Sequence, residues 1–244
     1  MGGDVLKPII GVSSAWSHET WRGIDKPDGF FYASSDYINA IYKTDGVPLM
    51  LSPMTMNLSK EAIIYEIFQR IDGLLLTGGG DVGINSSGTY KSELIEQQRC
   101  RYEFEALLIK EAWKRNMPVL GICRGHQMIV EILGGSITKQ PIIGHARGKG
   151  NDSGYHNITL SEHSSLTKIC QIGQWNVNSY HCQAVEKMPK ELDVSAICDD
   201  GIIEAVEARD KKFFIGVQFH PELLMNDDEA AVKLFRKFIE RSKK

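Results

Sequence analysis

One cysteine of this chain lies in a pattern that suits a nucleophile. Cys123 is the centre of the segment Gly121–Gly125 (GICRG), which completes an apolar run and opens a helix-forming stretch. A strand, a G-x-C-x-G turn and a helix form the nucleophile-elbow pattern, with cysteine in place of serine. The helix N-terminus would lie beside the sulfur, where its partial positive charge favours thiolate over thiol. The alternative, a buried structural cysteine in a glycine-rich turn, is disfavoured by this setting.

A base and its orienting group follow a second apolar run. Residues 213–217 are apolar and lead into His220, Pro221 and Glu222. We expect Pro221 to hold the chain extended, so that His220 and Glu222 point the same way. The carboxylate would then fix the imidazole tautomer and support its positive charge. A His and a Glu at a strand end are more often surface polar residues, but the nearby cysteine elbow favours a Cys123–His220–Glu222 triad.

A third segment offers backbone donors for an oxyanion. The glycine run Thr77–Gly80 directly follows the apolar run 73–76. We expect the amide of Gly79 or Gly80, together with that of Arg124, to bind the oxyanion of a tetrahedral intermediate. A phosphate-binding loop is the alternative, but no helix with Lys-Ser or Lys-Thr follows the glycines at once.

The elements that must position these residues are those of an α/β protein. Short apolar runs alternate with amphipathic stretches, which predicts a largely parallel sheet with ligands at the carboxyl ends of its strands. Predicted strands cover 9–13, 47–51, 73–76, 118–122, 157–160, 174–178, 194–197, 202–207 and 214–218. Predicted helices cover 35–44, 59–70, 97–116, 126–133 and 227–241, and predicted loops cover 82–95 and 140–154.

Length and composition narrow the class of protein. The chain has 244 residues with 42% hydrophobic and 24% charged, and we expect one domain over 1–244. A net charge of −3 leaves no basic surplus for phosphate contacts, so nucleic acid is not expected. Neither a membrane span nor a signal peptide is expected. Five dispersed cysteines without a C-x-x-C pair favour a reducing cytoplasm over disulfides or a zinc site.

Other polar residues give weaker signals. Asn178, Ser179, Tyr180 and His181 follow a predicted strand and could line a substrate pocket, with a plain polar loop as the equal alternative. A further group shows no metal-ligand spacing and is interpreted as loop or surface residues: His145, Arg147, His156 and His163.

With these residues in hand, the chain resembles class I glutamine amidotransferases, and more narrowly their γ-glutamyl-γ-aminobutyrate hydrolase branch, a cysteine peptidase-like family. The resemblance rests on Leu76–Asp81 (LTGGGD), Gly121–Gln127 (GICRGHQ), Val177–Gln183 (VNSYHCQ) and Gly216–Glu222 (GVQFHPE). It implies a flavodoxin-like three-layer sandwich, with a mostly parallel central sheet and helices on both faces. It also implies no metal and no organic cofactor.

The resemblance further implies a role for each matching position. Cys123 would be the nucleophile, His220 the base and acid, and Glu222 its orienter. Gln127 would contact the γ-glutamyl part of a small-molecule substrate. The implied reaction is hydrolysis of a γ-glutamyl amide through a glutamyl thioester, which releases glutamate and an amine. Residues around the pocket depart from the family pattern, for instance at His126, so the amine half of the substrate stays open.

Two other functions stay open. One is a glutaminase subunit that supplies ammonia to a separate synthetase, which needs a partner protein because we find no synthetase domain in this sequence. The other is a non-catalytic regulatory protein on the same fold, against which the complete triad weighs. A homodimer is also considered, whereas nucleic acid and membrane are not expected as partners.

Overall fold

The computed structural model describes residues 6–17, 30–53, 59–79, 93–146 and 154–244. Gly80 and Arg147 lie outside the described residues, as does most of the predicted loop 82–95.

The strands of the described part form one large sheet and two small ones. Their bounds are β1 Ile9–Ser13, β2 Ala15–Ser17, β3 Phe30–Tyr32, β4 Val47–Leu51, β5 Gly73–Leu76, β6 Val119–Ile122, β7 Ser136–Ile137, β8 Tyr155–Leu160, β9 Gln174–Asn178, β10 Val185–Lys187, β11 Leu192–Cys198, β12 Ile203–Ala208 and β13 Phe214–Val217. The large sheet has the order β4-β1-β5-β6-β13-β12-β11-β8-β9, while β2 pairs with β3 and β7 with β10. The five strands from β4 to β13 run parallel, and the rest pair antiparallel.

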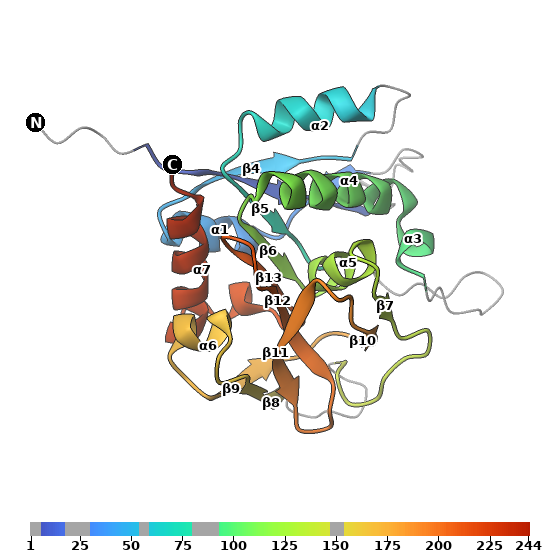
Figure 1. Ribbon diagram of the computed structural model, residues 1–244, viewed down its shortest axis with the longest axis vertical. Coiled ribbons are helices and arrows are strands. Elements are labelled where there is room, and N and C mark those ends of the chain that lie inside the picture. The colour runs from blue at the N-terminus through green and yellow to red at the C-terminus, as the bar shows by residue number, and fades with distance from the viewer. Residues whose placement is uncertain (1–5, 18–29, 54–58, 80–92, 147–153) are drawn as a thin grey trace, which may run out of the picture.

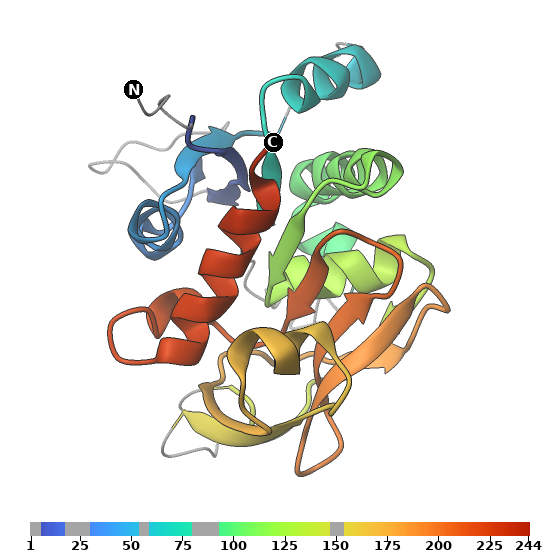
Figure 2. The same cartoon turned by 60° about the vertical axis from the view of Figure 1, so that its left-hand side comes forward.

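Helices cover both faces of the large sheet (Figures 1 and 2). Their bounds are α1 Ser35–Lys43, α2 Lys60–Phe68, α3 Leu94–Gln97, α4 Arg99–Arg115, α5 Arg124–Ile132, α6 Ser165–Cys170 and α7 Glu229–Ser242, with a 3-10 turn η1 at Pro221–Leu223. One apolar cluster joins α1, α6 and α7 to the sheet, and a second joins α2, α4 and α5 to it. The predicted three-layer α/β sandwich is therefore confirmed.

The centre of the sheet is made by three neighbouring parallel strands, β5, β6 and β13. Every residue of the three is buried, which explains why they read as continuous apolar runs rather than alternating ones. Their register pairs Leu76 with Gly121 and Gly121 with Gly216, so the three strands end at one edge of the sheet. Among the described residues, no helix combines the length and apolar character that crossing a bilayer requires.

The structure adds elements that the hydrophobic pattern does not predict. The short strands β2, β3, β7 and β10 have two or three residues each, and α6 has six, which is too short for a periodic signal. The segment after His220 also differs from expectation. It is not extended, because Pro221–Leu223 forms a 3-10 turn.

Candidate active site

Cys123 occupies a strained turn between β6 and α5. Its φ of 51° and ψ of −103° put a non-glycine residue in the left-handed half of backbone space, which is how an elbow exposes its nucleophile. Its N–H donates to the carbonyl of Val217 (2.8 Å), and its own carbonyl accepts from the N–H of Gln127 (3.1 Å). The thiol is partly buried at the N-terminus of α5.

Two glycines beside Cys123 allow the close packing of this turn. A Cβ at Gly125 would lie 2.3 Å from the carbonyl oxygen of Leu76, and one at Gly121 would lie 2.8 Å from the backbone of Gly125. Both distances are below any real Cβ contact, and the neighbours are backbone atoms that cannot swing aside. The G-x-C-x-G spacing therefore lets α5 begin directly against β5 and β6.

His220 and Glu222 form a close pair next to the cysteine. Nδ1 of His220 lies 2.6 Å from Oε1 of Glu222, and the two side chains are only 12% and 2% exposed. Burial lowers the pKa of His220, but the charge of Glu222 and the interaction with Cys123 outweigh it and hold this pKa well above its ordinary value. His220 and Glu222 lie side by side as predicted. The 3-10 turn, and not an extended chain, brings them together.

The glycine loop after β5 packs into the same site. A Cβ at Gly78 would lie 2.8 Å from Cε1 of His220 and 3.3 Å from Cβ of Cys123, so only glycine fits there. The Gly78 N–H donates to the hydroxyl of Tyr37 (3.0 Å), which leaves it unable to serve an oxyanion. Burial and the charges of Glu222 and Cys123 raise the pKa of Tyr37, so its hydroxyl stays protonated. Sequence reasoning does not single out Tyr37.

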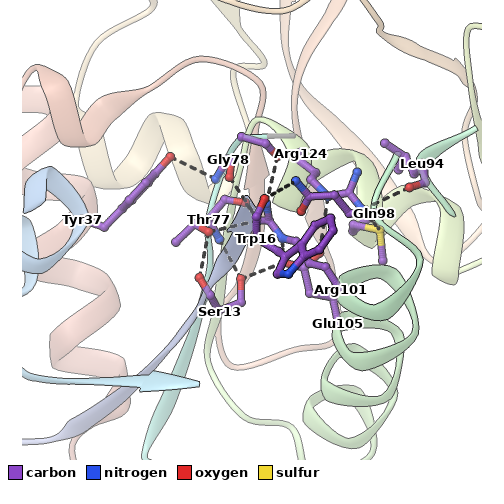
Figure 3. A network of polar contacts seen from close by, with 12 residues as sticks. Ser13, Trp16, Tyr37, Thr77, Gly78, Leu94, Gln98, Arg101, Glu105 and Arg124 are labelled. Atoms are coloured by element: carbon purple, nitrogen blue, oxygen red, sulfur yellow. Dashed lines mark hydrogen bonds and ion pairs between the residues drawn. The ribbon is translucent and has the colours of Figure 1, made fainter. Parts of the chain in front are cut away.

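A buried arginine binds the backbone carbonyls of the glycine loop 77–79 (Figure 3). Arg101 of α4 is fully buried, and its Nη1 donates to the carbonyl of Gly79 (2.9 Å). Its Nη2 donates to the carbonyls of Thr77 (2.7 Å) and Gly78 (3.1 Å). Carbonyl and N–H point in opposite directions across a planar trans peptide, so the N–H of Gly79 points away from Arg101. The clamp thus sets the direction of a predicted oxyanion donor.

The charge of Arg101 is balanced by Glu105, one helical turn further along α4. Oε1 of Glu105 accepts from Nε of Arg101 (2.8 Å) and from the hydroxyl of Ser13 (2.8 Å). Arg124 adds a second guanidinium, with Nε 3.7 Å from Oε2 of Glu105. Burial and the neighbouring charge of Arg101 lower the pKa of Arg124 to about 10. The side chain of Arg124 is thus anchored in the core, while its backbone amide opens α5.

Residues after β9 support the histidine. The side chain of Asn178 donates to the carbonyl of His220 (2.9 Å) and accepts from its N–H (2.8 Å). The ring of Tyr180 stands edge-on to the imidazole, with centroids 5.4 Å apart. Tyr180 is 37% exposed and is the member of the predicted cluster 178–181 that reaches the surface.

The other predicted substrate contacts are engaged inside the protein. The hydroxyl of Ser179 donates to the carbonyl of His145 (2.6 Å), and Nδ1 of His181 lies 3.0 Å from the carbonyl of Gln183. Gln127 donates through Nε2 to the carbonyl of Gln183 (3.0 Å). All three side chains are at most 5% exposed, so in this structure they brace the site from within.

The interpretation of the remaining histidines needs a correction. His163 is exposed as expected, but His145 is buried (3% exposed) and His156 is partly buried on β8. Both lie against the carboxylate of Glu204, which the sequence does not single out. Their spacing hides this cluster because its members come from segments far apart in the chain.

Comparisons with known proteins agree with this fold and identify a family. A profile described as peptidase C26 matches residues 8–222. A putative glutamine amidotransferase-like protein of Rickettsia prowazekii is 30% identical, over 97% of this chain and 98% of that protein. The gamma-glutamyl-gamma-aminobutyrate hydrolase of Escherichia coli K12 is 29% identical, over 83% of each chain. The solved structure of a glutamine amidotransferase from Thermotoga maritima superposes with a TM-score of 0.64 at 14% identity, covering 98% of this chain and 99% of that one. That structural likeness shows the fold alone.

Proposed function

We propose that this protein, a member of the peptidase C26 family among the class I glutamine amidotransferase-like proteins, hydrolyses γ-glutamyl amides with a cysteine nucleophile. The observation that carries it is the strained Cys123 turn beside a His220 that is paired with Glu222 at 2.6 Å. The printed activity of the Escherichia coli relative supports a γ-glutamyl substrate.

The first step forms a thioester. The raised pKa of His220 keeps the imidazole protonated beside Cys123, which favours a thiolate–imidazolium pair. The thiolate attacks the γ-carbonyl carbon, and the carbonyl oxygen becomes an oxyanion. The N–H of Gly79 and the N–H of Arg124 are the proposed donors to it. The C–N bond then breaks, and His220 gives its proton to the departing amine.

The second step releases glutamate. The neutral imidazole of His220 now accepts a proton from water, which attacks the thioester carbon. The C–S bond breaks, free glutamate leaves, and the thiolate–imidazolium pair returns. Glu222 supports the charge of His220 in both steps, and the Arg101 clamp holds the Gly79 amide in place throughout.

Incubation with a panel of γ-glutamyl compounds tests this proposal. The panel contains glutamine, γ-glutamyl-γ-aminobutyrate and γ-glutamyl amides of neutral and cationic amines, with α-glutamyl amides as controls. Free glutamate is measured for the wild type and for Cys123→Ala. We expect glutamate from at least one γ-linked compound, none from α-linked ones, and none with the variant. Release by Cys123→Ala at the wild-type rate would remove the thiol from the reaction.

A glutaminase subunit is the second candidate, supported by relatives described as glutamine amidotransferases. It predicts that glutamine is the preferred γ-linked compound and that turnover depends on a separate partner protein. The same panel separates the two functions, because a stand-alone hydrolase of γ-glutamyl amines needs no partner.

A further inference from the structure

A second polar cluster lies outside the residues assigned to catalysis, around the side chain of Glu204 on β12. This side chain is fully buried, and neither of its oxygens accepts a hydrogen bond from the described residues. Instead, three imidazole nitrogens surround Oε1, at 3.4 Å for His145 Nδ1, 3.4 Å for His156 Nε2 and 3.3 Å for His181 Nε2. A buried carboxylate whose nearest contacts are three imidazole nitrogens needs a positive charge among them, which a proton or a metal ion can supply.

The distances within this cluster match the edges of a metal coordination polyhedron. Nδ1 of His145 and Nε2 of His181 are 3.2 Å apart, and each lies 3.3–3.4 Å from Oε1 of Glu204. Zinc bonds nitrogen and carboxylate oxygen at about 2.0–2.1 Å, and a tetrahedron with such bonds has edges of about 3.3–3.4 Å. The three atoms therefore form one face of a tetrahedron of the right size.

The rings of His145 and His181 are each hydrogen-bonded through the nitrogen that faces away from Glu204. In a neutral ring, the nitrogen that faces Glu204 then carries a lone pair. Nε2 of His145 lies 2.7 Å from Oδ2 of Asp200, and Nδ1 of His181 lies 3.0 Å from the carbonyl of Gln183. Both acceptors require a protonated nitrogen on that side. The other nitrogen of each neutral ring then carries a lone pair. Carboxylate–histidine and carbonyl–histidine pairs of this kind orient metal ligands in proteins.

Two imidazole lone pairs and a carboxylate oxygen that face one another repel unless a cation lies between them. An extra proton on one ring is one such cation, and a metal ion is the other. A single proton joins only two of the three atoms. One metal ion can bond all three, including Oε1 of Glu204, which otherwise accepts no hydrogen bond from the described residues. His156 Nε2 also lies 3.4 Å from this oxygen, but it does not belong to the closely spaced group that the other three ligand atoms form.

We propose that His145, His181 and Glu204 bind one divalent transition-metal ion. Two imidazole nitrogens with one carboxylate oxygen are a donor set that zinc uses in proteins, so zinc is the metal to test first. The three ligands come from the loop before Ala146, from the segment after β9 and from β12. The ion would thus tie the antiparallel half of the sheet to the segment 178–181 that braces His220.

Metal content measured on the full chain tests this site. The protein is purified without a histidine tag, stripped with a chelator, re-exposed to zinc chloride and freed of unbound ions before elemental analysis. We expect about one zinc per chain, and a rise in melting temperature of about 5–10 °C on zinc addition. The exposed His163 provides a matched control, since His163→Gln removes a histidine outside the cluster. Glu204→Gln and His145→Gln should lower retained zinc at least tenfold.

Two further measurements keep the test decisive if a core variant fails to fold. X-ray absorption of the zinc-loaded wild type should show a first shell of nitrogen and oxygen without sulfur, and Cys123→Ala should retain the same zinc content. Zinc lost in Cys123→Ala would place the ion at that thiol. A sulfur ligand that persists in Cys123→Ala would place the ion at Cys198, which lies near His145 and His156, and either result would overturn the proposal. Absence of zinc from the wild type, with an unchanged melting temperature, would show that a proton occupies the cluster.

Discussion

The side-chain amide of Asn178 forms two hydrogen bonds with the backbone of His220, one to its carbonyl (2.9 Å) and one from its N–H (2.8 Å). Asn178 ends β9, and His220 follows β13, which is separated from β9 by three other strands of the sheet. This pair of bonds therefore holds the backbone of His220 from a distant part of the chain. We therefore interpret Asn178 as a positioning residue for His220, which the first prediction below tests.

Loss of the two hydrogen bonds between Asn178 and His220 should lower kcat more than it lowers the stability of the fold. Asn178→Ala removes two hydrogen bonds to buried backbone groups, worth about 1–3 kcal/mol of unfolding free energy. We expect kcat to fall about 10–100-fold, because a small displacement of His220 misaligns proton transfer. Asn176→Ala is the matched control, since Asn176 lies on the same strand and is exposed. Equal kinetics for the two variants would show that Asn178 does not position the histidine.

Glu222→Gln keeps the shape of the side chain and removes its charge. We expect kcat/KM to fall by about 100-fold or more, as loss of the orienting carboxylate does in other triads. Steady-state kinetics on the best γ-glutamyl substrate measures the effect. A fall of less than about tenfold, or 1.4 kcal/mol, would make Glu222 a minor participant.

The pH profile should report the raised pKa of His220. Burial favours the neutral ring, but the charge of Glu222 and the interaction with Cys123 outweigh it, so the imidazolium persists above pH 6.5. Acylation needs this proton, so the alkaline limb of kcat/KM should lie well above pH 6.5 in the wild type. Removal of the carboxylate in Glu222→Gln lowers the pKa and should move that limb to lower pH. An alkaline limb that does not move would separate Glu222 from the protonation of His220.

The Arg101 clamp predicts a selective effect on the rate. Arg101→Lys keeps a charge near Glu105 but loses the fork that reaches three successive carbonyls. We expect a clear loss of kcat with little change in KM, together with a lower melting temperature. Lys110→Gln on the exposed face of the same helix is the control. If KM rises while kcat stays unchanged, the clamp serves substrate binding instead of the oxyanion loop.

The sequence predicts the centre of this molecule well because strong local signals define it. Continuous apolar runs mark β5, β6 and β13, and the glycines around Cys123 mark a turn that other residues cannot form. The shared strand edge follows from parallel pairing, so the meeting of Cys123 with His220 could be predicted. Their catalytic roles stay predictions.

Features that depend on contacts between distant segments could not be predicted. Arg101 and Glu105 have the spacing of an ordinary exposed ion pair on a helix, and only the fold reveals that both are fully buried. The turn at Pro221 depends on where η1 packs. The histidines around Glu204 show no metal-ligand spacing because one strand and two loops, far apart in the chain, bring them together.

Thiol selectivity distinguishes Cys123 from the other cysteines. Burial raises the pKa of Cys170 to about 12 and that of Cys198 to about 11, so both should react slowly. Cys182 is the nearest competitor, being partly exposed next to His181. We expect brief, limiting iodoacetamide at pH 6–7 to label Cys123 first, with activity falling in step. Peptide mapping that finds Cys182 labelled first, in proportion to lost activity, would reassign the nucleophile.

The most direct test of the proposed mechanism is capture of the glutamyl group on the protein. The wild type is acid-quenched during turnover of its best substrate, and in parallel it is treated with a γ-glutamyl diazoketone, which alkylates a nucleophile at the γ position. Intact-mass analysis and peptide mapping locate each adduct. We predict one adduct per chain, on Cys123, absent from Cys123→Ala and formed in proportion to lost activity. A catalytically active chain that carries the diazoketone adduct on another residue, or none at all, would contradict the proposed reaction.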